Sequence, residues 1–246
     1  MIDGVTIYVL AVIFVATLIR SVFGFGEALV AVPLLALRIP VKTAAPLAVL
    51  VSVTVALIIV LQDWRHVEFR SAGWLIASTV AGIPIGVVLL ARGNRQLVTG
   101  ILGVVILGFA LYALARRQVH ELRADNLSWL LGCGFFAGVL GGAFGMNGPP
   151  LAIYGAMRRW SAQRFRATLQ GYFLPASVLG MTGYFFAGLW VPEVTRYFLL
   201  SLPGALLAIF LGGILNRRLR GDVFVRYVYM GLVIVGATLV IQAARG

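Results

Sequence analysis

The sequence predicts an all-α polytopic membrane protein built from two homologous repeats. Hydrophobic residues make up 61% of the chain and charged residues only 11%, which is more apolar than a soluble domain with a polar surface. The apolar residues form eight segments separated by short polar connectors. Two of these segments, about half a chain apart, are interrupted by glycine and proline, and this recurrence indicates the repeat.

In chain order the eight apolar segments cover residues 5–37, 44–61, 72–91, 97–115, 127–157, 167–191, 197–215 and 224–243. A membrane span needs about 20 apolar residues, so six of the segments have the length of one span. The first and fifth are too long for a straight helix, which rises about 1.5 Å per residue through about 30 Å of hydrocarbon. Each of these two is expected to be either a tilted, broken helix or a re-entrant hairpin.

The two breaks resemble each other in composition. Residues 21–37, SVFGFGEALVAVPLLAL, interrupt an apolar run with two glycines and the acid Glu27. Residues 140–156, LGGAFGMNGPPLAIYGA, do so again with glycines, Asn147 and two prolines. Backbone polar groups freed in a membrane must be satisfied by protein or by a wet cavity, and helices broken at matching places in two halves mark the binding site of a transporter. We therefore expect the breaks to meet near the membrane midplane.

Small residues elsewhere recur in the same order in the two halves. Gly86 and Arg92 recur as Gly212 and Arg218, and Gly103 and Gly108 recur as Gly231 and Gly236. These offsets are 126 to 128 residues, and the broken motifs match at about 121. We predict a single transmembrane domain over residues 1–246, with a first repeat of about 1–120 and a second of about 121–246.

The connector charges allow two topologies. Eight spans would place 12 Lys and Arg residues on one side and 7 on the other, with Arg20 left out. Six spans with two re-entrant segments would give 13 and 6, with the connectors at 63–70, 116–125, 158–166 and 217–226 cytoplasmic. Both models place both termini outside. The re-entrant model is preferred because three spans per half make the repeats inverted, with two equivalent gates around one site.

Glu27, out of eight acids, and Arg20, out of twenty basic residues, lie well inside an apolar stretch and away from the polar connectors. A charged residue in the membrane costs at least about 2.5 to 3.5 kcal/mol, so each is a functional candidate. The alternative is a structural ion pair, or an Arg20 that reaches to the interface. Seven residues apart across a break, the two side chains need not touch.

The breaks are suited to a small anion. Glycines expose backbone N–H groups, and a helix that begins after a break directs the positive end of its dipole at the cavity. Close helix packing alone would also explain the glycines. The predicted substrate site comprises Gly24, Phe25, Gly26, Glu27, Gly145, Met146, Asn147, Gly148 and Gln170. Glu27 is the predicted proton-coupling residue, because a bound anion would favour its protonated form and so link proton binding to anion binding.

Several function classes are disfavoured. Cys133 has no cysteine partner, and His66 and His120 fall in different connectors, so we expect neither a metal site nor another cofactor. Serines occur in the apolar segments without a histidine, so we do not expect an intramembrane enzyme. The basic excess lies in short connectors that face anionic lipid, which argues against nucleic acid as a partner. No GxxxxGK[ST] loop is present for ATP coupling.

The two glycine-rich breaks in a small duplicated membrane chain resemble those of the TauE/SafE sulfite exporter family of anion permeases, over essentially the whole chain. The family's glycine run is matched by Gly24 and Gly26 in the first half and by Gly141, Gly142, Gly145 and Gly148 in the second. Glu27 and Asn147 interrupt the glycines, which leaves the substrate open.

The resemblance implies a multi-pass protein of the cell inner membrane. Such a protein exports or takes up sulfite, an organosulfonate or a related small oxyanion, driven by an ion gradient. The expected partners are therefore the anion, protons and membrane lipid. A passive anion channel would use the same glycine-lined site and remains the alternative. The sequence leaves open whether the chain forms a homo-oligomer.

Overall fold

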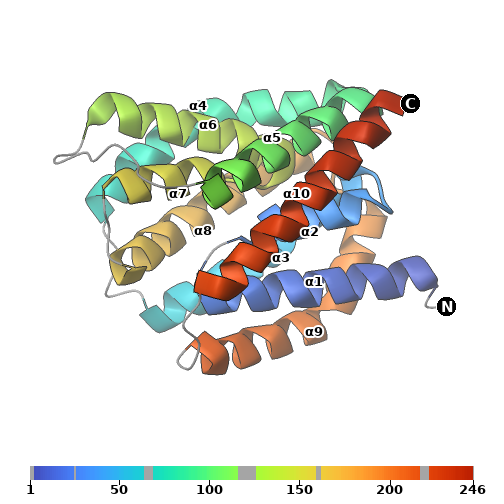
Figure 1. Ribbon diagram of the computed structural model, residues 1–246, viewed down its shortest axis with the longest axis horizontal. Coiled ribbons are helices and arrows are strands. Elements are labelled where there is room, and N and C mark those ends of the chain that lie inside the picture. Colours follow the sequence, from blue (N-terminus) through green and yellow to red (C-terminus); the bar gives the residue numbers. More distant parts are fainter. Residues whose placement is uncertain are drawn as a thin grey trace.

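The computed structural model describes residues 3–24, 26–63, 69–115, 126–158, 162–216 and 222–245 (Figure 1). Regular structure within these ranges is entirely α-helical. The described helices are α1 (Gly4–Phe23), α2 (Glu27–Ala36), α3 (Val41–Asp63), α4 (Phe69–Arg92), α5 (Arg95–Ala115), α6 (Leu127–Phe144), α7 (Gly148–Met157), α8 (Ala162–Phe186), α9 (Pro192–Asn216) and α10 (Asp222–Arg245). Within the described residues, seven helices are long and apolar enough to cross a membrane, and α1 and α6 are among them.

Each segment that the sequence marks as broken forms two helices. α1 and α6 both end at a glycine in the left-handed conformation, Gly24 with φ 84° and Gly145 with φ 68°. Glycine suits these positions because it has no Cβ to strain there. Each glycine caps its helix, since the N–H of Gly24 donates to the carbonyl of Arg20 at 2.6 Å and that of Gly145 to Gly141 at 2.8 Å. The breaks are therefore two helix ends of the same kind.

The first broken segment is an antiparallel hairpin. The hydroxyl of Tyr8, in the first half of α1, donates to the carbonyl of Leu34, near the end of α2, at 2.6 Å. The guanidinium of Arg38 also lies over the Tyr8 ring, 5.8 Å from its centroid. α2 therefore folds back along α1, and the alternative of one tilted, broken helix is wrong for this segment.

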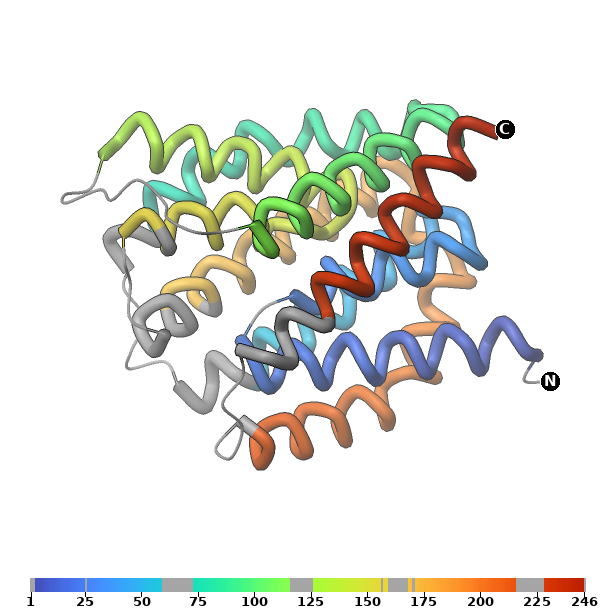
Figure 2. Tube along the Cα trace, in the orientation of Figure 1, coloured from blue at the N-terminus to red at the C-terminus, as the bar shows by residue number. Residues whose placement is uncertain are grey.

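Helices of one half pack mainly on helices of the other. α4 packs on α6, and in the same way α9 packs on α1. α3 packs on α8 and α5 on α10, so each of these helices meets the helix that the predicted repeat aligns with it. Figure 2 shows α5 and α10 side by side although they are far apart in the sequence. The core therefore lies between the halves.

Glycines allow the closest of these contacts. On α6, a Cβ at Gly138 would lie 2.9 Å from the Cα of Thr79, and on α4, a Cβ at Gly86 would lie 2.5 Å from the nitrogen of Ala143. Gly212, which the sequence matches to Gly86, meets α1 in the same way, at Ser21. The match of Gly103 to Gly231 does not extend to packing, because Gly103 packs against Gly236, whereas a Cβ at Gly231 would meet no described atom within 4 Å.

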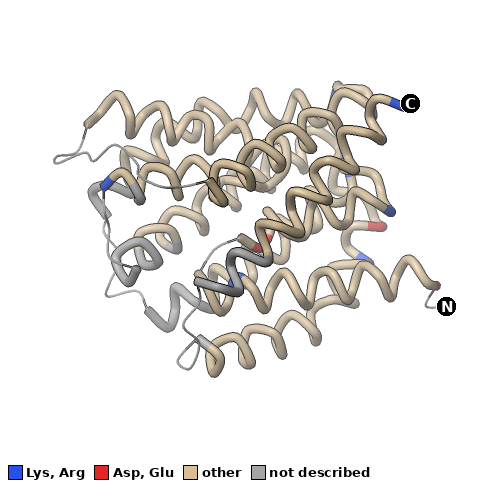
Figure 3. The backbone as a smooth tube through the Cα atoms, viewed as in Figure 1, with Lys and Arg blue, Asp and Glu red and all other residues tan. Residues whose placement is uncertain are grey.

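The first helices of the two halves, α1 and α6, run in opposite directions. α1 runs away from the end of the molecule that holds both termini, and α6 runs toward it (Figure 1). Most charged residues in the described part lie near helix ends (Figure 3). Among the described residues, the buried charged side chains are Arg20 and Glu27, each 2% exposed. These two residues stand at the first break.

Candidate functional site

A small cavity lies where the two breaks come together. Its volume is about 30 Å³, and residues of both breaks line it. The first break contributes Gly26, Glu27, Ala28 and Leu29, and the second contributes Gly145, Met146, Asn147, Gly148 and Pro149. The remaining wall comes from α1, α3 and α8, through Arg20, Ser52, Phe173 and Ser177. Residues of both breaks thus line one shared cavity.

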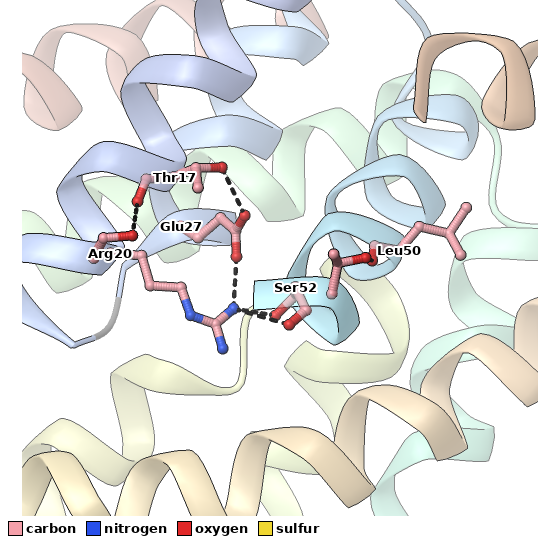
Figure 4. Close-up of polar contacts among 7 residues, drawn as sticks. Thr17, Arg20, Glu27, Leu50 and Ser52 are labelled. Carbon is pink, nitrogen blue, oxygen red and sulfur yellow. Dashed lines mark hydrogen bonds and ion pairs between the residues drawn. The ribbon is translucent and has the colours of Figure 1, made fainter. Parts of the chain in front are cut away.

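An ion pair of Arg20 and Glu27 forms one side of the cavity (Figure 4). The left-handed glycines Gly24 and Gly26 reverse the direction of the chain between α1 and α2. The last turn of α1, which holds Arg20, therefore faces the first residue of α2, Glu27. Nη1 of Arg20 donates to Oε2 of Glu27 at 2.5 Å. The hydroxyl of Thr17 donates to Oε1 of Glu27 at 3.1 Å. Both carboxylate oxygens therefore accept a hydrogen bond from α1.

Arg20 also reaches the other walls of the cavity. Its Nη1 donates to the hydroxyl of Ser52 on α3 at 2.5 Å and lies 3.4 Å from the Ser52 carbonyl oxygen (Figure 4). Its guanidinium carbon lies 5.4 Å from the centroid of the Phe173 ring on α8, within cation–π range. The cation is thus held at the meeting point of α1, α2, α3 and α8.

Asn147, which also lines the cavity, is held by a chain of hydrogen bonds. Its side-chain amide donates to the hydroxyl of Tyr172 at 3.3 Å, and that hydroxyl lies 2.7 Å from the Thr79 hydroxyl. The Thr79 hydroxyl donates in turn to the carbonyl of Gly134 at 2.8 Å. A Cβ at Gly141 would lie 2.6 Å from the Asn147 amide, so only glycine leaves room for this side chain. The amide is therefore fixed beside the cavity.

Two helix N-termini border the cavity, those of α2 and α7. The first backbone bond within α2 runs from Val30 N–H to Gly26 carbonyl, so the N–H groups of Glu27, Ala28 and Leu29 precede the helical ladder. In α7, Pro149 and Pro150 have no N–H to donate. Both helix dipoles favour negative charge, but the N–H donors come mainly from α2.

Most of the predicted site residues line the cavity, but not all of them do. Gly26, Glu27, Gly145, Met146, Asn147 and Gly148 line the cavity. Gly24 is not in its wall and instead caps α1. Phe25 and the side chain of Gln170 lie outside the described part of the chain. That the lining residues bind a substrate stays a prediction.

The predicted site did not include Arg20, Ser52, Phe173 and Ser177, which also line the cavity. Arg20 could have been included because a basic residue deep inside an apolar segment is rare. The sequence does not show, however, that its side chain contacts Glu27. Ser52 and Ser177 are 125 residues apart (177 − 52), which falls within the repeat offsets of 121 to 128. That spacing could have indicated that they occupy matching places in the two halves.

The family of the chain follows from a comparison of sequences. The model of the sulfite exporter TauE/SafE family matches residues 9–239, nearly the whole length. The chain belongs to the TauE/SafE family. No curated protein and no solved structure matches it. Membership of this family, together with the long apolar helices, makes the chain a multi-pass membrane protein of a transporter family.

Proposed function

We propose that this TauE/SafE protein is a secondary transporter of a small sulfur-containing oxyanion, such as sulfite or a sulfonate, and that the shared cavity is its binding site. The observation that carries the proposal is that both breaks line one cavity beside a buried arginine. Two helix N-termini, a guanidinium and an amide all favour a negative ligand. The family match supports the same class of substrate.

The size of the cavity supports a small substrate. A water molecule needs about 10 to 15 Å³ of such volume, so about 30 Å³ corresponds to two or three waters. An oxyanion with one central atom is of this scale. A longer organosulfonate would need its organic part to reach out of the cavity.

We also propose that the repeats are inverted and that the two broken segments, α1–α2 and α6–α7, enter the cell inner membrane from opposite sides. The opposite directions of α1 and α6 support this arrangement (Figure 1). The exchanged packing, α4 on α6 and α9 on α1, is what a two-fold axis between the halves produces. Such repeats give two equivalent routes to one central site.

Glu27 is the proposed coupling residue. It is the buried acid among the described residues, and it lines the cavity. An ionised Glu27 and an anion in the same small cavity would repel each other, so anion binding favours proton uptake. The transported unit is then an anion together with a proton.

Flux into proteoliposomes tests the function. Radiolabelled sulfite, sulfate, methanesulfonate and chloride are offered with and without an imposed pH gradient. Accumulation of a sulfur oxyanion above its equilibrium level, only with the gradient, is expected. Flux that only equilibrates the anion would instead identify a passive channel, and accumulation of chloride alone would exclude the proposed substrate class.

A further inference from the structure

Arg20 is the charged group that the cavity offers to an anion. Its guanidinium lines the cavity and is held there by Ser52 and the ring of Phe173. A guanidinium is always protonated in proteins and presents a planar set of five N–H donors that matches an oxyanion. Its position is therefore suited to direct binding of the substrate.

Glu27 holds this cation from within the same cavity. One carboxylate oxygen accepts from Arg20 at 2.5 Å and the other from Thr17 at 3.1 Å. A bound monoanion and an ionised Glu27 would have to share one cation. Two like charges a few ångströms apart in a poorly polar interior disfavour each other strongly.

We propose that Arg20 exchanges partners during transport: it pairs with ionised Glu27 when the site is empty, and with the substrate anion once Glu27 is protonated. The inference rests on the proposed function and adds how the site links proton to anion. The proton adds to the Glu27 carboxylate from the side to which the site is open, and it leaves with the anion on the other side. The buried charges sum to zero in both states, so neither state leaves a buried charge uncompensated.

Among the described residues around Glu27, Arg20 is the other group that carries charge. Its hydrogen-bond partner Thr17 on α1 and the cavity-lining Ser52 on α3, Phe173 and Ser177 on α8 are uncharged. Within the described part of the chain, the linkage therefore involves Arg20 and Glu27.

The second half has no equivalent pair. The offset of 121 residues aligns Arg20 with Gly141 and Glu27 with Gly148, and the amide of Asn147 packs at Gly141. The described lining of the cavity therefore holds one acid, Glu27, and one cation, Arg20. This predicts one proton for each monovalent anion.

The test measures binding of methanesulfonate to the purified full-length protein by calorimetry between about pH 5 and pH 8, where this probe stays a monoanion. For the wild type, the Kd should rise with pH, approaching tenfold per unit where binding takes up one proton. Glu27→Gln mimics the protonated acid and should bind with an affinity that does not change with pH. Arg92→Gln, an exposed arginine at the end of α4, is the control and should behave as the wild type.

Removing Arg20 alone would strand a buried carboxylate, so the informative variant is the double change Arg20→Gln with Glu27→Gln. Both residues are then neutral amides of similar shape, and the protein should fold. We expect this variant to bind methanesulfonate at least a hundredfold more weakly than Glu27→Gln. Equal affinity of these two variants would overturn the role of Arg20.

Two other results separate the proposals. A wild type that binds methanesulfonate equally at all pH values would overturn the exchange while leaving oxyanion binding intact. A folded wild type that binds neither sulfite nor methanesulfonate at any pH would overturn the proposed function, and the exchange with it.

Discussion

At the scale of single residues, glycine at position 141 decides where Asn147 can lie. The Asn147 amide occupies the space that a side chain at this position would need. The Asn147 amide also donates to the hydroxyl of Tyr172, which is itself held by a hydrogen bond with Thr79. One missing methyl group on α6 thus allows a polar group to reach the cavity wall.

Gly141→Ala is therefore expected to displace Asn147 and weaken anion binding about tenfold or more. Overpacking of this kind costs about 1 to 3 kcal/mol, which is comparable to that loss. The measurement is methanesulfonate affinity by calorimetry. Gly132→Ala on the same helix, where a Cβ would meet nothing within 4 Å, is the matched control. Unchanged affinity in Gly141→Ala would remove Asn147 from the proposed site.

At the scale of helices, a glycine in the left-handed conformation ends the helix at each break. Gly24 and Gly145 end α1 and α6 in a conformation that other residues rarely adopt. The hairpin of α1 and α2 is then secured by packing, as the bond from Tyr8 to Leu34 shows. The position of this hairpin depends in turn on α9, which packs along α1.

Neighbouring glycines of α9 allow a paired test of that contact. A Cβ at Gly212 would meet Ser21 and the carbonyl of Leu18 at 3.3 Å, whereas a Cβ at Gly213 would meet nothing within 4 Å. Gly212→Ala should destabilise the protein by about 1 to 3 kcal/mol, because α1 must move. Gly213→Ala should be neutral or stabilising by up to about 1 kcal/mol, because alanine favours a helix. Thermal unfolding in detergent measures both, and equal melting temperatures would contradict the close contact.

At the scale of the whole molecule, the two halves complete each other. α4 and α9 cover the first helix of the opposite half, and α5 and α10 pair along one face (Figure 2). Neither half contains the full cavity, since its wall draws on α1, α2, α3, α7 and α8. A half expressed alone would leave the apolar surfaces of its helices unpaired.

Cysteine labelling tests the proposed topology. In a Cys133→Ser background, a cysteine at the exposed position Gln96, next to the turn between α4 and α5, should react with an impermeant maleimide from outside the cell. The six-span arrangement places this turn on the same side as the termini. Gly4→Cys, at the start of α1, is the positive control, since both topologies place the N-terminus outside. Labelling of position 96 only after permeabilisation would favour eight spans.

Much of the helix content could be predicted from the sequence alone. Long apolar runs that lack charge form helices in a membrane because each backbone group must be satisfied within its own segment. Glycine interrupts such runs through its own backbone geometry, so the places of both breaks were evident from Gly24, Gly26 and Gly145. Pro149 and Pro150 instead lie in the first turn of α7. Glu27 and Asn147 could be predicted as cavity residues because polar groups inside apolar segments need a wet or polar neighbourhood.

Only the tertiary structure decided which of these groups meet. Arg20 and Glu27 lie seven residues apart across a turn, and their contact depends on the hairpin folding back and on Ser52 of α3 holding the guanidinium. Ser52, Phe173 and Ser177 reach the cavity because α3 and α8 pack together. Hydrophobic pattern and backbone propensity act over a few neighbouring residues, whereas these contacts join helices distant in the chain, whose relative placement depends on the packing of both halves.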